Sequence, residues 1–148
     1  MSNDESTIWW PCDGGVCTLH EHCRECGGSP CGHKSTRRLA DLPAIKGAIA
    51  KAIGAEAATV ELHATSNVFR VMLVNRKMND APAAGRANEA SAIRSIVSQA
   101  IAGKPAFKKI AAIRVEYLVR SHQNAKPKVI DLIEFRKDAS GSFRHHVS

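Results

Sequence analysis

Apolar residues recur at the spacing of an α-helix in two separate stretches of the chain. In the first stretch, residues 35–54, the apolar positions of one face are Leu42, Ile45, Ile49, Ala52 and Ile53. Asp41 can cap the start of this helix, Pro43 is tolerated in its first turn, and Gly54 is placed to end it. The pattern therefore predicts a helix within residues 35–54.

The second helical stretch, residues 88–102, has the clearer pattern. Its apolar face is formed by Ile93, Ile96, Val97, Ala100 and Ile101. Asn88 can cap the start of this helix, and Gly103 predicts its end. The preceding residues 75–87 are basic and contain proline and glycine, so we expect a flexible loop there.

Alternation of apolar and polar residues predicts β-strands in the rest of the chain. Residues 58–74 are typical of a β-hairpin, because polar turn residues separate two alternating runs. In the strand expected at residues 109–120, one face carries Ile113, Val115, Tyr117 and Val119, and the other carries Arg114, Glu116, Leu118 and Arg120. A further strand is expected at residues 129–136, and residues 143–147 have the pattern of a last edge strand.

These elements follow one another in the order α-β-β-α-β-β, with one more strand if residues 143–147 pair. Short connections favour antiparallel pairing, and a sheet must bury one face against helices. We therefore expect residues 35–148 to form an α+β domain with an antiparallel sheet and two helices on one face. Residues 1–34 have neither helical nor strand periodicity, so they form a separate irregular segment before it.

All five cysteines of the chain lie between Cys12 and Cys31, together with two of its seven histidines. From residue 12 to residue 33 the pattern is C-x4-C-x2-H-x-H-C-x2-C-x4-C-x-H, which places eight thiol and imidazole groups in 22 residues. A stretch of this composition cannot build a hydrophobic core and needs a metal or a cross-link to hold a fold. In a reducing compartment, clustered cysteines favour metal binding over disulfides.

The best-defined part of this segment is the pair Cys23 and Cys26. Their two-residue spacing lets both thiolates bind one ion, and the glycine that follows permits a tight turn. Zn²⁺ prefers four ligands in a tetrahedron. Cys17 and Cys31 are the first choice for the other two ligands, which gives a site of four thiolates.

Other ligand sets and other chemistries remain open for the same segment. His20 or His33 can replace one of the thiolates, and Cys12 is a further candidate ligand. Four cysteines can also hold an iron–sulfur cluster, although the spacing matches neither standard ferredoxin pattern. Thiols with a redox role and no metal are the third alternative.

Charge is distributed unevenly along the chain, whose net charge is +7. Residues 1–34 hold two basic and five acidic residues, a net charge of −3, and residues 35–148 hold 19 basic and 9 acidic residues, a net charge of +10. A basic body attracts phosphate or acidic surfaces. The lysines expected to converge at one end of the sheet are Lys104, Lys108, Lys109, Lys126 and Lys128. Aromatic residues are few among them, which predicts phosphate contact without base stacking.

The sequence lacks the phosphate-binding, dinucleotide-binding, nucleophile-elbow and zinc-protease motifs that would indicate an enzyme. It has no apolar stretch near the roughly 18 residues of a membrane span, and its start lacks the basic and apolar pattern of a secretory leader. The leading hypothesis is a non-enzymatic cytoplasmic zinc protein that binds a protein partner or nucleic acid. The alternatives are a small iron–sulfur or thiol redox protein, including an accessory subunit of a larger enzyme, and a structural subunit of an assembly.

Overall fold

The computed structural model describes residues 33–147, which form an α+β fold as the sequence predicts. The longer elements are α1 (His33–Ala52), β1 (Val60–Ala64), β2 (Val68–Val74), α2 (Ala83–Ile101), β3 (Ala112–Val119), β4 (Lys128–Lys137) and β5 (Phe143–His146). Three short 3-10 helices connect them within these residues: η1 (Ala57–Thr59), η2 (Lys77–Asp80) and η3 (Pro105–Phe107). The Cys/His-rich segment predicted at residues 1–34 lies outside the described residues, apart from the first two residues of α1.

Helix α1 begins earlier than the apolar pattern predicts. It starts at His33, so Asp41 lies inside the helix and the prediction that it caps the start was wrong. The sequence misled because proline is most common in a first turn, whereas here the helix continues through Pro43. The carboxylate of Asp41 instead accepts a hydrogen bond of 2.6 Å from Lys104 Nζ. The predicted end is confirmed, since Gly54 has a φ of 60° just after the last turn.

Helix α2 also begins before its predicted start, at Ala83 and not at Asn88. The buried residues of α2 are Ala90, Ile93, Val97 and Ile101, so its first turn contributes no large apolar side chain that could have revealed it. The prediction of a flexible loop at residues 75–87 was therefore wrong, because this stretch contains η2 and the first turn of α2. The predicted end at Gly103 is confirmed by its φ of 70°.

The five strands form one mixed sheet in the order β1-β2-β3-β4-β5. Strands β1 and β2 are antiparallel, as the predicted hairpin requires, but β2 and β3 are parallel. The prediction of an entirely antiparallel sheet was wrong at this junction. Residues 75–111 join the two strands and contain α2, and a connection of this length is the crossover that parallel neighbours need.

The last three strands are antiparallel neighbours, as predicted. The expected edge strand at the end of the chain is confirmed as β5, which pairs with residues 134–137 of β4. A register shift interrupts the pairing of β3 with β4 between Tyr117 and Leu118. Because β4 runs antiparallel to both β3 and β5, the start of β3, the end of β4 and the start of β5 lie at one end of the sheet.

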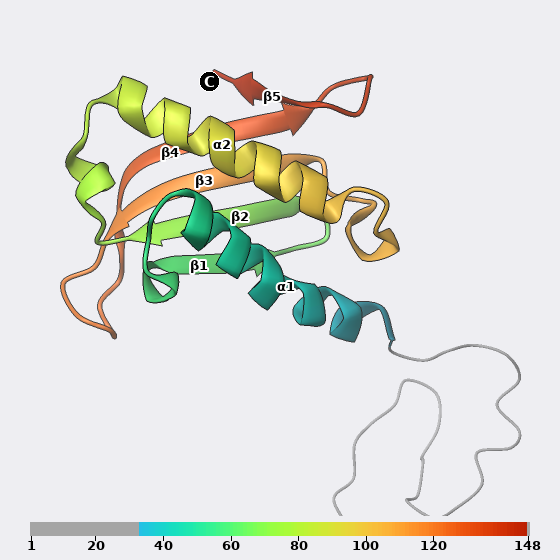
Figure 1. Cartoon of the computed structure of the whole chain (residues 1–148), viewed down its shortest axis with the longest axis horizontal. Coiled ribbons are helices and arrows are strands. Elements are labelled where there is room, and N and C mark those ends of the chain that lie inside the picture. The colour runs from blue at the N-terminus through green and yellow to red at the C-terminus, as the bar shows by residue number, and fades with distance from the viewer. Residues whose placement is uncertain (1–32, 148) are drawn as a thin grey trace, which may run out of the picture. The chain divides into compact units, whose positions relative to one another are not determined.

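Both helices cover the same face of the sheet (Figure 1). The core between them includes Ile45, Ile49, Ile93 and Val97 from the helices and Phe69, Val71, Leu73, Ile113, Val115, Tyr117, Ile133 and Phe135 from the strands. The predicted faces of β3 are confirmed from Ile113 to Tyr117, since Ile113, Val115 and Tyr117 belong to this core while Arg114 and Glu116 alternate with them. The prediction was wrong beyond the register shift, where Leu118 is buried and Val119 is 40% exposed. We call the side of the sheet that carries Arg70, Arg114, Glu116, Glu134 and Arg136 the open face.

Candidate nucleic-acid interface

The open face carries a ladder of charged side chains. One row that crosses the five strands of the sheet consists of His63, Arg70, Arg114, Glu134 and His146. Arg70 and Arg114 are direct cross-strand neighbours of like charge, which is unfavourable. Each guanidinium is therefore paired with a carboxylate, Arg70 with Glu116 and Arg114 with Glu134. Arg70 donates two hydrogen bonds of 2.8 Å to Glu116, and these bonds raise the pKa of Arg70.

Glu134 joins two of the arginines on this face. Its Oε1 accepts a hydrogen bond of 2.5 Å from Arg136 Nε, and its Oε2 accepts one from Arg114 Nε. These bonds, that of Arg136 first, lower the pKa of Glu134 although the residue is only 7% exposed. A carboxylate that is ionised and already bonded is a poor general acid at neutral pH. The ladder is therefore suited to holding charge in place and not to acid–base chemistry.

The structure separates the lysines that the sequence was expected to bring together. Lys104, Lys108 and Lys109 flank η3 and precede β3, whereas Lys126 and Lys128 lie between β3 and the start of β4. These are opposite ends of the sheet, at the right and the left of Figure 1. The eight residues of β3 span about 25 Å, so the two groups form separate surfaces. Lys104 also differs from the others because it is engaged by Asp41.

One of these two ends gathers further cations that the sequence reasoning did not group with the lysines. The backbone N–H of Lys137 donates to the carbonyl of Ala111 at 2.8 Å, and Arg136 pairs with Ala112 across β3 and β4. Arg136 in turn pairs with Arg144 on β5. We call this surface the basic end, and it comprises the exposed residues Lys108, Lys109, Arg136, Lys137 and Arg144.

Two carboxylates accompany the five cations of the basic end. One is Glu134, bonded to Arg136, and the other is Asp138 in the turn between β4 and β5. The hydroxyl of Ser140 and the guanidinium of Arg144 lower the pKa of Asp138 to about 2. Five cations against two carboxylates leave a positive surface, and the side chain of Arg144 is still 77% exposed.

A signal in the sequence could have found this grouping. The short polar stretch at residues 138–141 separates the strands expected at residues 129–136 and 143–147, so it brings the end of one next to the start of the other, and both strand ends carry arginine. Antiparallel pairing with residues 109–120 then places the same end beside Lys108 and Lys109. The grouping was missed because the lysines were assigned by their distance along the sequence and not by strand direction.

The opposite end of the sheet is richer in matched charges. Arg76 pairs with Glu89 at 2.8 Å, and these two side chains are 11% and 8% exposed. Arg120 bonds Glu61 at 2.9 Å, and Arg86 bonds Asp131 at 2.8 Å. These three arginines are committed to internal pairs, which leaves Lys126 and Lys128 as the exposed cations of the candidate set at this end.

No phenylalanine or tyrosine ring in the described part of the chain is available for base stacking. Every phenylalanine and tyrosine there is buried: Phe69, Phe107, Tyr117, Phe135 and Phe143 are at most 4% exposed. Recognition of single-stranded bases requires aromatic rings that reach the surface. The arrangement is therefore compatible with contact to phosphates and lacks a stacking platform within residues 40–147.

The metal ligands expected from the sequence lie outside the described residues, except for His33. Cys12, Cys17, His20, Cys23, Cys26 and Cys31 precede the described residues, and His33 is the first residue of α1. Within the described part, no group of three His, Cys, Asp or Glu side chains is arranged to hold a metal ion. Neither of its two α-helices is long and apolar enough to cross a membrane.

Comparison with known proteins gives no relative from which a function could be transferred. No family model, no curated protein and no solved structure matches this chain.

Proposed function

We propose that the protein is a non-enzymatic cytoplasmic binding protein in which zinc folds the Cys/His-rich segment and the basic end contacts nucleic-acid phosphates. The proposed ligands of the zinc are Cys17, Cys23, Cys26 and Cys31, with His20, His33 or Cys12 as replacements for one of them. The observation that carries the nucleic-acid part is the gathering of five exposed cations from three stretches of sequence at one end of the sheet.

The chemistry of the basic end favours phosphates over bases. Lysine and arginine neutralise phosphates and release the counterions condensed on a duplex, which gives affinity without reading sequence. Among the described residues every phenylalanine and tyrosine ring is buried, which favours phosphate contact over stacking on unpaired bases for this part of the chain. We therefore expect binding to a duplex that is strongly weakened by salt and nearly independent of sequence.

The test is fluorescence anisotropy of a short labelled duplex, repeated over a series of salt concentrations. The double variant Lys108→Glu, Lys109→Glu should bind more weakly, and its plot of log affinity against log salt should be less steep by about 2. The matched control is Lys126→Glu, Lys128→Glu, which changes the charge equally at the opposite end of the sheet. Equal losses in both double variants would show a diffuse charge effect and would reject the basic end as the contact surface.

The metal part has its own test, which is elemental analysis of the freshly purified full-length chain. One equivalent of zinc in a colourless protein is expected. Visible absorbance together with iron would select an iron–sulfur cluster instead, and a metal-free chain with titratable or disulfide-linked thiols would reject the metal site.

A further inference from the structure

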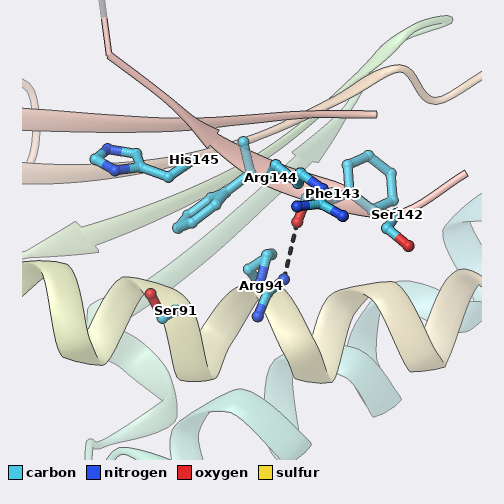
Figure 2. Close-up of a pocket in the computed structure, with 7 residues that line it drawn as sticks. Ser91, Arg94, Ser142, Phe143, Arg144 and His145 are labelled. Carbon is cyan, nitrogen blue, oxygen red and sulfur yellow. Dashed lines mark hydrogen bonds between the residues drawn. The ribbon is translucent and has the colours of Figure 1, made fainter. Parts of the chain in front are cut away.

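A shallow hollow of about 440 Å³ lies between the middle of α2 and β5 (Figure 2). It is lined by Ser91, Arg94, Phe135, Ser142, Phe143, Arg144 and His145. Two guanidinium groups, one imidazole and two hydroxyl groups are therefore present, and no carboxylate belongs to the lining. Phe135 and Phe143, which also line the hollow, are buried.

Arg94 differs from every other arginine whose side chain the structure describes. Each of the others has a carboxylate within ion-pair distance: Arg70, Arg76, Arg86, Arg114, Arg120, Arg136 and Arg144. Arg94 Nη1 donates to the carbonyl of Phe143 at 2.8 Å, and Nη2 donates to the hydroxyl of Ser95 at 3.2 Å. Both acceptors are neutral, so this partly buried cation has no counter-charge among the described residues.

The side chain of Arg94 is held in place by its surroundings. The bond to the Phe143 carbonyl, drawn in Figure 2, directs the guanidinium from α2 towards β5. Its central carbon lies 5.7 Å from the centre of the Phe135 ring, and the His145 ring lies 5.6 Å from the same centre. A cation fixed in advance loses little entropy when it binds an anion, and a partly desolvated one gains more from the bond.

We propose that this hollow is a phosphate-binding site in which Arg94 is the principal ligand. Ser91 lies one turn before Arg94 on the same face of α2, and Ser142 and His145 line the hollow from the side of β5. Arg144 also belongs to the lining, but its guanidinium is already bonded to Asp138. A phosphate group offers at least three acceptor oxygens, and guanidinium groups match its geometry. The site goes beyond the proposed contact at the basic end, because Arg94, Ser91 and His145 are not part of that surface.

Inorganic phosphate is the probe for the test, added to the full-length ¹⁵N-labelled chain at constant ionic strength maintained with chloride. The amides of Ser91, Arg94, Ser142 and His145 should shift in a saturable way. Arg94→Gln should weaken this affinity by about tenfold or more, because it removes a charge-assisted hydrogen bond. Lys51→Gln removes the same charge from an exposed position on α1, outside both the hollow and the basic end, and should leave the phosphate affinity unchanged.

Arg94→Gln also removes the hydrogen bond from Arg94 to β5, so a second variant that keeps this bond is needed. Ser91→Glu places a carboxylate three residues from Arg94 on an exposed helical position and should supply the missing counter-charge. It should abolish phosphate binding without lowering the melting temperature. Phosphate shifts that scatter over the surface, or an unchanged affinity in Ser91→Glu, would overturn the proposal.

The source of the phosphate is decided by a parallel duplex-binding measurement. If Arg94→Gln weakens both phosphate and duplex binding, the hollow holds a nucleic-acid phosphate. If it weakens phosphate binding alone, the ligand is a small phosphorylated compound. Either result supports the site, and neither depends on Lys108 or Lys109, so the failure of the basic end and the failure of the hollow are distinguishable.

Discussion

At the scale of single residues, the net charge of the domain overstates the cations that can bind a partner. Most arginines are engaged by carboxylates of the same sheet or of α2, including the nearly buried Glu116 and Glu134. Most lysines in the described part of the chain are exposed, whereas Lys104 is engaged by Asp41. A count of basic residues therefore cannot locate a binding surface, because it does not show which cations already have a partner.

Glu134→Gln tests the charged ladder of the open face. The hydrogen bonds from Arg136 and Arg114 lower the pKa of Glu134, so the stabilisation is present above the ordinary glutamate pKa of about 4.3 and is lost as the pH falls through the lower folded value. At pH 7 we expect the free energy of unfolding to fall by about 1 kcal/mol. The difference from the wild type should shrink when urea denaturation is repeated below pH 4.

The control for this experiment is Glu61→Gln, which removes the partner of Arg120 at a position whose side chain is 37% exposed. An exposed pair contributes little, so a change of no more than about 0.5 kcal/mol is expected. A larger loss in Glu61→Gln than in Glu134→Gln would contradict the role assigned to burial.

Tyr117 gives a second prediction at this scale, because it is the one tyrosine of the chain. Its hydroxyl donates to the carbonyl of Arg86 at 2.8 Å, and burial together with the charge of Glu89 raises its pKa. The folded protein should show no tyrosinate absorbance at a pH of about 10, where an exposed tyrosine is half ionised. Since the raised pKa favours the neutral phenol, stability should be lost at still higher pH, and the tyrosinate band should appear together with unfolding.

At the scale of elements, the sequence predicted which elements exist better than where they start or how they pair. The buried faces of α1, α2 and β3 consist of apolar residues that recur at regular spacing, so the periodicity of the sequence predicted these elements. The first turn of α2 buries no large apolar residue, and its start at Ala83 left no periodic signal. The parallel pairing of β2 with β3 depends on where the crossover packs, which local patterns do not encode.

The candidate site divides in the same way. Lys108 and Lys109 could be proposed from the sequence, and the structure leaves both exposed. Their neighbours Arg136 and Arg144 were not grouped with them, because the grouping depends on strand direction: the register places Arg136 opposite Ala112 and Arg144 opposite Arg136. The site around Arg94 could not be predicted from the sequence, because the sequence does not show which arginine lacks a carboxylate partner in the fold.

Asn79 is the residue whose replacement should most directly test the crossover. It is 2% exposed in η2, and its Nδ2 donates to the carbonyls of Leu73 and Leu118 at 3.2 and 2.7 Å. It therefore fastens the start of the crossover to the ends of both parallel strands. Asn79→Ala should lower the free energy of unfolding by about 2 kcal/mol in urea denaturation, because two buried carbonyls lose a donor.

Asn79→Asp is the matched comparison, since it keeps the shape of the side chain and replaces the donating amide with an acceptor. It should be at least as destabilising as Asn79→Ala at pH 7 and less so when the carboxylate is protonated at low pH. If the aspartate variant is as stable as the wild type at pH 7, the two hydrogen bonds do not hold the crossover.

At the scale of the whole molecule, the chain combines two stretches that differ in how a fold can be stabilised. Residues 40–147 bury a continuous core of aliphatic and aromatic side chains between α1, α2 and the sheet. Residues 12–33 supply thiols, imidazoles and glycines, a composition that cannot build a hydrophobic core and for which we propose a metal as the source of folding free energy. The opposite net charges of residues 1–34 and 35–148 follow the same division.

Spectroscopy can separate these two stretches, because both tryptophans, Trp9 and Trp10, precede Cys12 while Tyr117 lies in the core of the domain. If a metal folds the Cys/His-rich segment, a chelator added under reducing conditions should change the tryptophan emission, and zinc should restore it. The alkaline titration of Tyr117 should be the same before and after chelation, because the domain has a core that does not depend on the metal. Tryptophan emission that does not respond to the chelator in a protein shown to contain the metal would mean that the metal does not organise this segment. A simultaneous shift in the Tyr117 titration would mean that the two stretches fold as one unit.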